Sequence, residues 1–209
     1  GRETDYISIF NEDNYFRLPP GDGVKVIIVN SHSSEKVAGD IAVAEISDDL
    51  LRLLQSRGIS AYLDDTEYDA EGTIGAYKRM SDNVARLKNI YKEAVVVIDL
   101  HDSDSGAPFT FTVGTSDNFA WQENLRFACA IYKLMDNHNA AFRMLPTSLG
   151  QDNGLLNINI GIGGSEGTAI EGREMLSSFS ACLQRYSPNL SEKLSEIAFA
   201  LTFSLVSNV

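Results

Sequence analysis

The sequence predicts a single α/β domain with a mostly parallel central sheet and helices on both of its faces. Short β-branched runs alternate along the chain with segments whose apolar residues recur at helical spacing, an order typical of repeated strand–helix units. The run Ala94–Leu100 is almost free of polar residues, as expected of a central strand that helices cover on both faces. We treat residues 1–209 as one domain, in which residues 1–23 form an N-terminal extension, because this length supports one sizeable core.

The first half of the domain is predicted from its apolar runs and from the turn-forming residues that separate them. Val24–Val29 is β-branched and lies between a Pro/Gly-rich and a Ser-rich segment, which indicates a buried strand. Ile41–Gln55 has the apolar spacing of a helix, and Gly58 follows as a typical helix terminator. Next come a short strand at Ile59–Leu63, an acidic loop, and a second helix at Ile74–Ile90.

The second half continues the alternation. Strands are expected at Ala94–Leu100, Phe109–Val113, near Ala141–Leu145 and at Leu155–Ile162, and helices at Trp121–Met135, Thr168–Gln184 and Ser191–Val206. In such a sheet ligands bind at the carboxyl ends of the parallel strands. The two cysteines, Cys129 and Cys182, fall in helical segments, and we expect two buried thiols rather than a disulfide.

Charge and hydropathy exclude several classes of partner. The formal net charge is −12, whereas nucleic-acid binding requires a concentrated basic surface, so we expect no nucleic-acid partner. The longest unbroken apolar run, Ala94–Ile98, is far shorter than a membrane span, and the chain does not open with a signal-like segment. The start at Gly1 is compatible with an anchor or signal upstream.

Two histidines are the best candidates for metal binding. His32 and His101 each follow a predicted central strand, so parallel geometry brings both to the same edge of the sheet. A zinc hydrolase needs about three protein ligands from imidazole and carboxylate groups, with one position left open. The carboxylates near enough in sequence to be the third ligand are Glu35, Asp40, Asp102 and Asp104.

A series of motifs resembles one known family. The segment NSHSSE at residues 30–35 resembles the HTHTTE segment of the stage II sporulation protein P family. The members of that family are zinc-dependent peptidoglycan hydrolases related to N-acetylmuramoyl-L-alanine amidases. Further matches follow in order: LDDTEYD at 63–69, YKRM at 77–80, DLHD at 99–102, VGT at 113–115 and WQEN at 121–124. The resemblance runs from about Val24 to Ser180 and depends on the order of these motifs.

This resemblance implies an amidase-like fold of the phosphorylase/hydrolase-like kind, one zinc ion and cleavage of the bond between the glycan lactyl group and the stem peptide. It implies peptidoglycan or wall peptide as the ligand, protein partners in wall remodelling, and an extracytoplasmic location in the cell envelope, with any membrane anchor outside this chain. His32 and His101 are then metal ligands with Glu35 or Asp40 as the third, although Asn30 replaces the family's first histidine. Arg79 is a candidate to bind a substrate carboxylate, which a guanidinium matches in a bidentate manner.

One departure from the family pattern concerns catalysis. The segment QDNGLLNINIGIGG at residues 151–164 aligns without gaps on the family's QDLSPGALLIEVGG, which places the catalytic glutamate on Gly161. A general base contributes roughly 100- to 10,000-fold to such a reaction, and glycine cannot supply one. Glu166 and Glu171 are the nearest downstream substitutes, and the segment TAIEG at 168–172 resembles a strand that ends in a carboxylate.

Three functions remain open at this point. The leading interpretation is a zinc-dependent peptidoglycan hydrolase of the amidase type. The alternative is a catalytically inactive homologue that binds wall peptide or a protein in the same cleft, which the loss of the carboxylate at Gly161 favours. A third is a zinc deacylase or carboxypeptidase that acts on small acylated amino acids, since paired strand-end histidines suit that chemistry as well.

Overall fold

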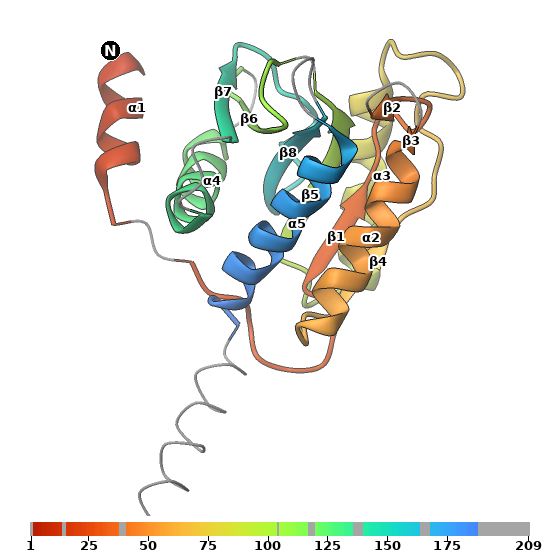
Figure 1. The fold of residues 1–209 in the computed structure, drawn as a ribbon, viewed down its shortest axis with the longest axis horizontal. Coiled ribbons are helices and arrows are strands. Elements are labelled where there is room, and N and C mark those ends of the chain that lie inside the picture. Colours follow the sequence, from red (N-terminus) through yellow and green to blue (C-terminus); the bar gives the residue numbers. More distant parts are fainter. Residues whose placement is uncertain are drawn as a thin grey trace, which may run out of the picture.

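A six-stranded sheet forms the centre of the computed structural model, which describes residues 2–13, 16–37, 41–103, 105–116, 120–135, 140–163 and 168–187. The strand order across the sheet is β4-β1-β5-β8-β6-β7 (Figure 1). In chain order these strands are β1 (Val26–Val29), β4 (Ala61–Leu63), β5 (Val96–Asp102), β6 (Phe109–Gly114), β7 (Ala140–Leu145) and β8 (Leu156–Ile162). A separate small hairpin pairs β2 (Lys36–Val37) with β3 (Ile41–Ala42).

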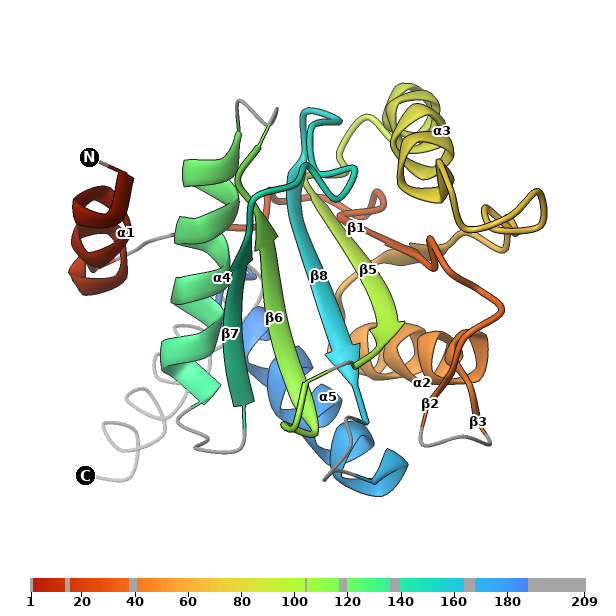
Figure 2. The same cartoon turned by 90° about the horizontal axis from the view of Figure 1, so that it is seen from above.

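The direction of the strands determines which of their ends meet at one edge of the sheet. β4, β1, β5 and β8 run parallel, whereas β6 runs antiparallel to β8 and parallel to β7 (Figure 2). The pairing of Phe109 with Ile162 places the start of β6 beside the end of β8. The carboxyl ends of β1, β5 and β8 therefore meet the amino ends of β6 and β7, and the prediction of a mostly parallel sheet with β5 near its centre is confirmed.

Helices cover the two faces of the sheet unequally. The helices are α1 (Arg2–Asn11), α2 (Val43–Ser56), α3 (Ala76–Ile90), α4 (Trp121–Met135) and α5 (Ala169–Gln184). α2, α4 and α5 pack in the larger apolar cluster on one face, and α3 packs in a second cluster against β1 and β5 on the other. This second face is polar over β8, β6 and β7, and the candidate site described below lies there.

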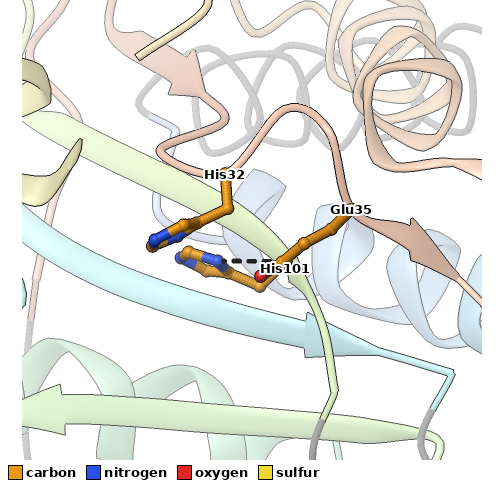
Figure 3. Close-up of side chains that lie close together, drawn as sticks. All are labelled: His32, Glu35 and His101. Carbon is orange, nitrogen blue, oxygen red and sulfur yellow. Dashed lines mark ion pairs between the residues drawn. The ribbon is translucent and has the colours of Figure 1, made fainter. Parts of the chain in front are cut away.

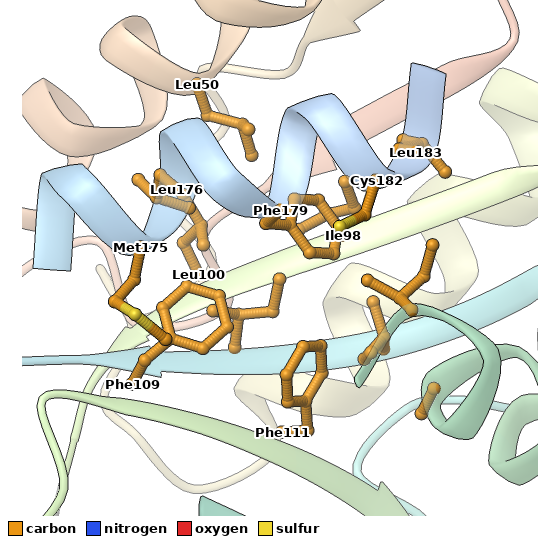
Figure 4. Packing of buried hydrophobic residues seen from close by; sticks show 14 of the residues in the cluster. Leu50, Ile98, Leu100, Phe109, Phe111, Met175, Leu176, Phe179, Cys182 and Leu183 are labelled. Atoms are coloured by element: carbon orange, nitrogen blue, oxygen red, sulfur yellow. The ribbon is translucent and has the colours of Figure 1, made fainter. Parts of the chain in front are cut away.

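The larger core is dense and aromatic (Figure 4). Phe179 of α5 is fully buried beside Phe109 and Phe111 of β6, with ring centroids 6.3 Å away in both pairs. Cys129 and Cys182 are buried free thiols in the same cluster, as predicted. Burial of this apolar surface fixes α5 on the sheet and so holds the end of β8 in place.

The structure corrects the sequence predictions at several points. Helix α1 and the β2–β3 hairpin were not predicted, and Ile9 and Leu18 of the presumed extension belong to the core. Residues 168–172 are not strand-like, because the helix α5 begins at Ala169 after an N-cap at Thr168. The predicted helix Ser191–Val206 lies outside the described residues. Among the helices that the structure describes, none is long and apolar enough to cross a membrane.

Candidate metal centre

Two neighbouring parallel strands bring the predicted histidines together. β1 and β5 pair in register, with Val29 beside Asp99. The chain leaves β1 in a turn that carries His32, whereas His101 belongs to β5 itself, one residue beyond the predicted end of that strand. The two imidazole rings lie 5.3 Å apart between centroids.

Glu35 joins these two side chains in one group. The ligand-type atoms of His32, Glu35 and His101 all lie within 4.8 Å of one another (Figure 3). The backbone N–H of Glu35 donates to the carbonyl of His32 at 3.1 Å, and this closed turn directs both side chains to the same place. Two imidazoles and one carboxylate are the donor set of several zinc hydrolases, so the residues present fit that ion.

The buried carboxylate of Asp99 orients the His101 ring. It is fully buried, and its Oδ2 lies 2.8 Å from His101 Nε2, while its Oδ1 accepts a hydrogen bond from the backbone N–H of Ser31 at 2.9 Å. The opposite ring nitrogen, Nδ1, faces Glu35 at 3.5 Å. Zinc-binding histidines commonly have one ring nitrogen held by a carboxylate in this way, which orients the other nitrogen towards the metal.

The electrostatics of this group favour a cation. Burial of His101 lowers its pKa, but Asp99 and then Glu35 outweigh this effect and raise the pKa to about 10. Two carboxylates beside one buried imidazole concentrate negative potential there. The same field that retains a proton on the ring would attract a divalent ion.

Asp69 fixes the turn that carries the ligands. Its Oδ1 accepts a hydrogen bond from Ser33 Oγ at 2.8 Å, and its Oδ2 accepts from the backbone N–H of Ser34 at 3.1 Å and from Ser34 Oγ. Burial raises the pKa of Asp69, but these hydrogen bonds outweigh it and lower the pKa to about 2. The carboxylate therefore ties the acidic loop to the turn between His32 and Glu35.

A cavity of about 210 Å³ opens beside the group on the polar face of the sheet. Tyr77 of α3 closes one side, with its ring centroid 4.8 Å from that of His32 and 5.7 Å from that of His101. The sheet supplies the floor, which consists of His101 and Ser103 from β5 and the following segment, Asn159 and Gly161 from β8, Thr110 and Thr112 from β6, and Arg143 and Leu145 from β7. The arrangement is a polar groove that begins at the candidate metal group.

Gly161 lies directly beside His101. The two residues are paired in the β5–β8 register, and both line the cavity. A Cβ atom at position 161 would lie 3.1 Å from the Cβ of Ser103, which is tight but close to contact distance. Position 161 therefore faces the cavity, where the family resemblance requires a glutamate, but the residue supplies no carboxylate.

Other predicted residues lie elsewhere. Glu171 is in the first turn of α5, where its side chain accepts hydrogen bonds from the backbone N–H and hydroxyl of Thr168 in a capping box. Arg79 donates to the carbonyls of Tyr68, Gly72 and Ile74, and so braces the loop before α3. Neither residue lines the cavity.

The remaining ligand candidates divide into two kinds. Asp102 lines the cavity, and its backbone N–H donates to Glu35 Oε2 at 2.9 Å. Asp40, Asp104 and Glu166 lie outside the described residues. Of the two candidates for the third ligand that the structure describes, Glu35 and Asp102, Glu35 is the one that lies in a group with both histidines.

Sequence reasoning missed three residues of the site. Asn159 donates to Asp99 Oδ2 at 3.1 Å, Asp69 braces the ligand turn, and Arg143 lines the cavity. A signal was present for Asn159 and Arg143, because each is a polar residue that alternates with apolar ones in a strand. Asp69 is the last residue of the motif LDDTEYD, but its role could not be deduced locally, because its partners are 35 and 36 residues away.

Comparison with protein families identifies the group to which the chain belongs. The family model of stage II sporulation protein P matches residues 20–142, which is more than half of the chain. The chain is a member of the stage II sporulation protein P family. This match contains His32, Glu35 and His101 and ends before β8, so Gly161 lies beyond it. No curated protein sequence matches the chain significantly.

Solved amidase structures share the fold of this sporulation-family chain. The N-acetylmuramyl-L-alanine amidase of Mycobacterium smegmatis is 11% identical with a TM-score of 0.51, and the match covers 82% of this chain and 96% of that one. An N-acetylmuramoyl-L-alanine amidase from Clostridium difficile is 10% identical with a TM-score of 0.51, covering 79% and 95%. The catalytic domain of an amidase from Bacillus (Paenibacillus) polymyxa is 14% identical with a TM-score of 0.50, covering 82% and 99%. The predicted amidase-like α/β fold is thus confirmed.

Proposed function

We propose that this chain is a zinc-dependent peptidoglycan hydrolase of the N-acetylmuramoyl-L-alanine amidase type, which acts on wall peptides in the cell envelope. The observation that carries the proposal is the His32–Glu35–His101 group at the edge of an amidase-like sheet. Membership of the sporulation protein family supports the choice of substrate. The groove beside the group supplies space for a peptide.

The roles of the residues follow from their contacts. His32, Glu35 and His101 would hold the ion, which when bound would polarise the scissile carbonyl and acidify an attacking water. Asp99 holds the Nε2 side of His101, so that Nδ1 is directed towards the ion position. Tyr77 packs against both imidazole rings and limits their rotation.

Proton transfer is the incomplete part of this site. Of the described residues that line the cavity, the carboxylates are Glu35 and Asp102, and Glu35 belongs to the metal group. Gly161 leaves the family's general-base position without a proton acceptor. We therefore expect hydrolysis to be slower than in a site with a glutamate at this position, by up to the roughly 100- to 10,000-fold that a general base contributes.

A second function is favoured by the same glycine. A family member that keeps its metal group and groove but lacks the base would bind wall peptide without cleaving it. In that case the groove would serve recognition, and the chain would act as a binding module within a wall-remodelling assembly.

The test is zinc content followed by digestion of purified peptidoglycan. We expect about one zinc per chain in the wild-type protein and none in His32→Ala or His101→Ala, with slow release of stem peptide that also depends on both histidines. Zinc without release, together with sedimentation of the protein on insoluble peptidoglycan, would support the binding module instead. A wild-type protein that takes up no zinc would exclude the hydrolase.

A further inference from the structure

We infer that Gln151 and Asn159 form a buried hydrogen-bond relay that fixes which ring nitrogen of His101 faces the metal position. Neither residue belongs to the metal group; both act on it through Asp99, so they are positioning residues. This inference rests on the proposed function, because it concerns the ion that His101 would hold. Gln151 is fully buried and lies beyond residues 20–142, the part of the chain that the family model matches.

Backbone groups of β6 fix the orientation of the Gln151 side chain. The N–H of Gly114 donates to Gln151 Oε1 at 2.8 Å, and Gln151 Nε2 donates to the carbonyl of Thr112 at 3.0 Å. A backbone N–H can only donate and a backbone carbonyl can only accept, so the two ends of this amide cannot exchange without losing both hydrogen bonds. Gln151 therefore directs its nitrogen, and not its oxygen, towards Asn159.

The same polarity passes to Asn159 and then to Asp99. Gln151 Nε2 donates to Asn159 Oδ1 at 2.5 Å, which leaves Asn159 Nδ2 to donate to Asp99 Oδ2 at 3.1 Å. Gln151 and Asp99 are fully buried and Asn159 is 3% exposed. A reversed Asn159 would set its oxygen against the Asp99 carboxylate and leave buried polar groups unpaired, which is costly where water cannot replace them.

The end of the relay decides which nitrogen of His101 carries a hydrogen. A carboxylate accepts, and Asp99 Oδ2 lies 2.8 Å from His101 Nε2, so this nitrogen is the donor. Asn159 Nδ2 lies 3.0 Å from Nε2 because both nitrogens converge on the same oxygen, and Ser31 Oγ, at 3.3 Å, is a second acceptor for Nε2. The nitrogen left to supply a lone pair to an ion is Nδ1, which faces Glu35 at 3.5 Å.

A further buried amide holds the loop that carries Gln151. Asn124 of α4 donates to the carbonyl of Gln151 at 3.1 Å and accepts from the backbone N–H of Asn157 at 2.9 Å. The loop is thereby attached to α4 and β8, while the Gln151 side chain is attached to β6. The orientation of the relay is therefore set by packed elements of the fold and does not depend on the side chains of the metal group.

The experiment measures zinc affinity and the position of the hydrogen on His101, with the whole chain. Asn159→Leu removes the relay at a similar side-chain volume and is expected to weaken zinc binding by about 10- to 100-fold, because His101 loses part of the arrangement that orients it. Competition with a chelator measures the affinity. Long-range proton–nitrogen NMR spectra of zinc-loaded wild-type protein with isotope-labelled histidine are expected to show His101 with its hydrogen on Nε2 and the metal on Nδ1.

Asn157→Leu is the matched control, because it makes the same substitution two residues earlier on β8. Asn157 is fully buried, lies on the same face of the strand as Asn159, and has a side-chain amide with no hydrogen-bond partner among the described residues. We expect this variant to keep the wild-type zinc affinity. Urea unfolding verifies that each variant is folded. A merely structural role of Asn159 would change the unfolding free energy and leave the zinc affinity as it is.

A double-variant cycle tests whether Gln151 acts through Asn159. Gln151→Met keeps the length of the side chain without its amide and is expected to weaken zinc binding by about 10- to 100-fold in the wild-type background. In the Asn159→Leu background the same substitution should have little further effect, because the relay is already broken. Additive effects would contradict the relay. Should Gln151→Met fail to fold, Asn159→Leu and its control decide the question.

The relay and the proposed function fail on different results. If the wild-type protein binds zinc and Asn159→Leu binds it equally tightly, or if His101 holds the zinc through Nε2, the relay is refuted and the proposed function stands. If the wild-type protein takes up no zinc, the proposed function fails and the relay fails with it.

Discussion

Gly161 is the residue at which the sequence departs from the catalytic motif that the family resemblance implies. It is paired with His101 and lines the cavity, and the space above it is bordered by the hydroxyl of Ser103. Ser103 Oγ lies 3.2 Å from Thr110 Oγ1 and 2.8 Å from Ser105 Oγ. A cluster of hydroxyl groups thus lies beside position 161.

Restoring the carboxylate at this position should increase hydrolysis. Gly161→Glu is expected to raise the rate of peptide release from peptidoglycan by about 100- to 10,000-fold, because it supplies a general base beside the metal group. The new side chain requires Ser103 to shift by a few tenths of an ångström, so Ser103→Gly is added in a second version of the variant. Gly161→Gln, which has the same shape without a base, should remain at the wild-type rate. Equal rates in the glutamate and glutamine variants would show that the base comes from elsewhere.

The lowered pKa of Asp69 predicts that its contribution to the stability of the fold depends on pH. Its pKa is about 2 in the folded protein against an ordinary value of 3.8, and the residue is 9% exposed. A lowered pKa stabilises the fold at pH values above about 4, and this stabilisation is lost as pH falls from about 4 to about 2. Asp69→Asn is therefore expected to lower the free energy of unfolding by about 2 kcal/mol at pH 7, and by much less near pH 2.

Urea unfolding at both pH values measures this effect. Asp65→Asn is the matched control, because Asp65 is exposed in the same acidic loop. A difference between Asp69→Asn and the wild type that stays constant from pH 7 to pH 2 would exclude the ionised carboxylate as the source of the stabilisation.

At the scale of elements, the start of α5 determines which carboxylates are available to the site. Thr168 and Glu171 satisfy each other's backbone groups in a capping box, and Gly172 approaches Ile162 so closely that an added Cβ would lie 2.2 Å from Ile162 Cγ2. The helix is therefore packed tightly against the end of β8 and directs Glu171 into its own N-terminus. This geometry explains why Glu171, although it is close in sequence to Gly161, does not line the cavity.

The capping box can be tested by its contribution to stability. Thr168→Ala is expected to lower the free energy of unfolding by about 1 kcal/mol, because it leaves a backbone N–H at the helix start without its acceptor. Chemical denaturation measures the change, and Ser178→Ala, within the same helix and away from the cap, is the control. Glu171→Gln should alter stability more than turnover. A large loss of turnover at unchanged stability would restore Glu171 as a catalytic candidate.

Strands and their loops were predictable from sequence to different extents. Val26–Val29 and Val96–Asp102 are recognisable because long apolar runs bounded by polar segments have few other interpretations. His32 and His101 follow from these two strands, since neighbouring parallel strands end at one edge. Glu35 could be proposed but not selected, because the choice among four carboxylates depends on a turn that Asp69 closes from another loop.

The antiparallel direction of β6 and β7 and the position of β8 between β5 and β6 were not predictable, although each of these strands was expected. Strand direction depends on which neighbour pairs with which, and no local pattern encodes that β8 inserts between β5 and β6. The register that aligns Arg143 with Asp99 depends on this insertion. The arginine singled out from the sequence was Arg79, whereas the arginine that lines the groove is Arg143.

At the scale of the whole molecule, the two faces of the sheet are covered differently. One face carries α2, α4, α5 and most of the apolar core, and the other carries α3 over β1 and β5 with the polar groove beside it. Most of the apolar core thus lies on the face opposite the polar groove. The metal group lies at the boundary, because His101 and Asp99 belong to the central strand of the sheet.

Metal binding should consequently stabilise the entire domain. An ion that binds the folded state alone adds about 2.7 kcal/mol at a free concentration a hundredfold above its Kd. For a chain of this size each kcal/mol raises Tm by about 2–4 °C, so saturating zinc is expected to raise Tm by about 5–10 °C. Thermal unfolding with and without zinc measures the shift, which should be absent in His101→Ala and Glu35→Gln and retained in Glu67→Gln, a substitution of an exposed carboxylate in the acidic loop. An undiminished shift in His101→Ala would place the ion elsewhere. If the Tm increase with zinc is lost in His101→Ala and Glu35→Gln but retained in Glu67→Gln, then zinc stabilises the domain through the His32–Glu35–His101 group.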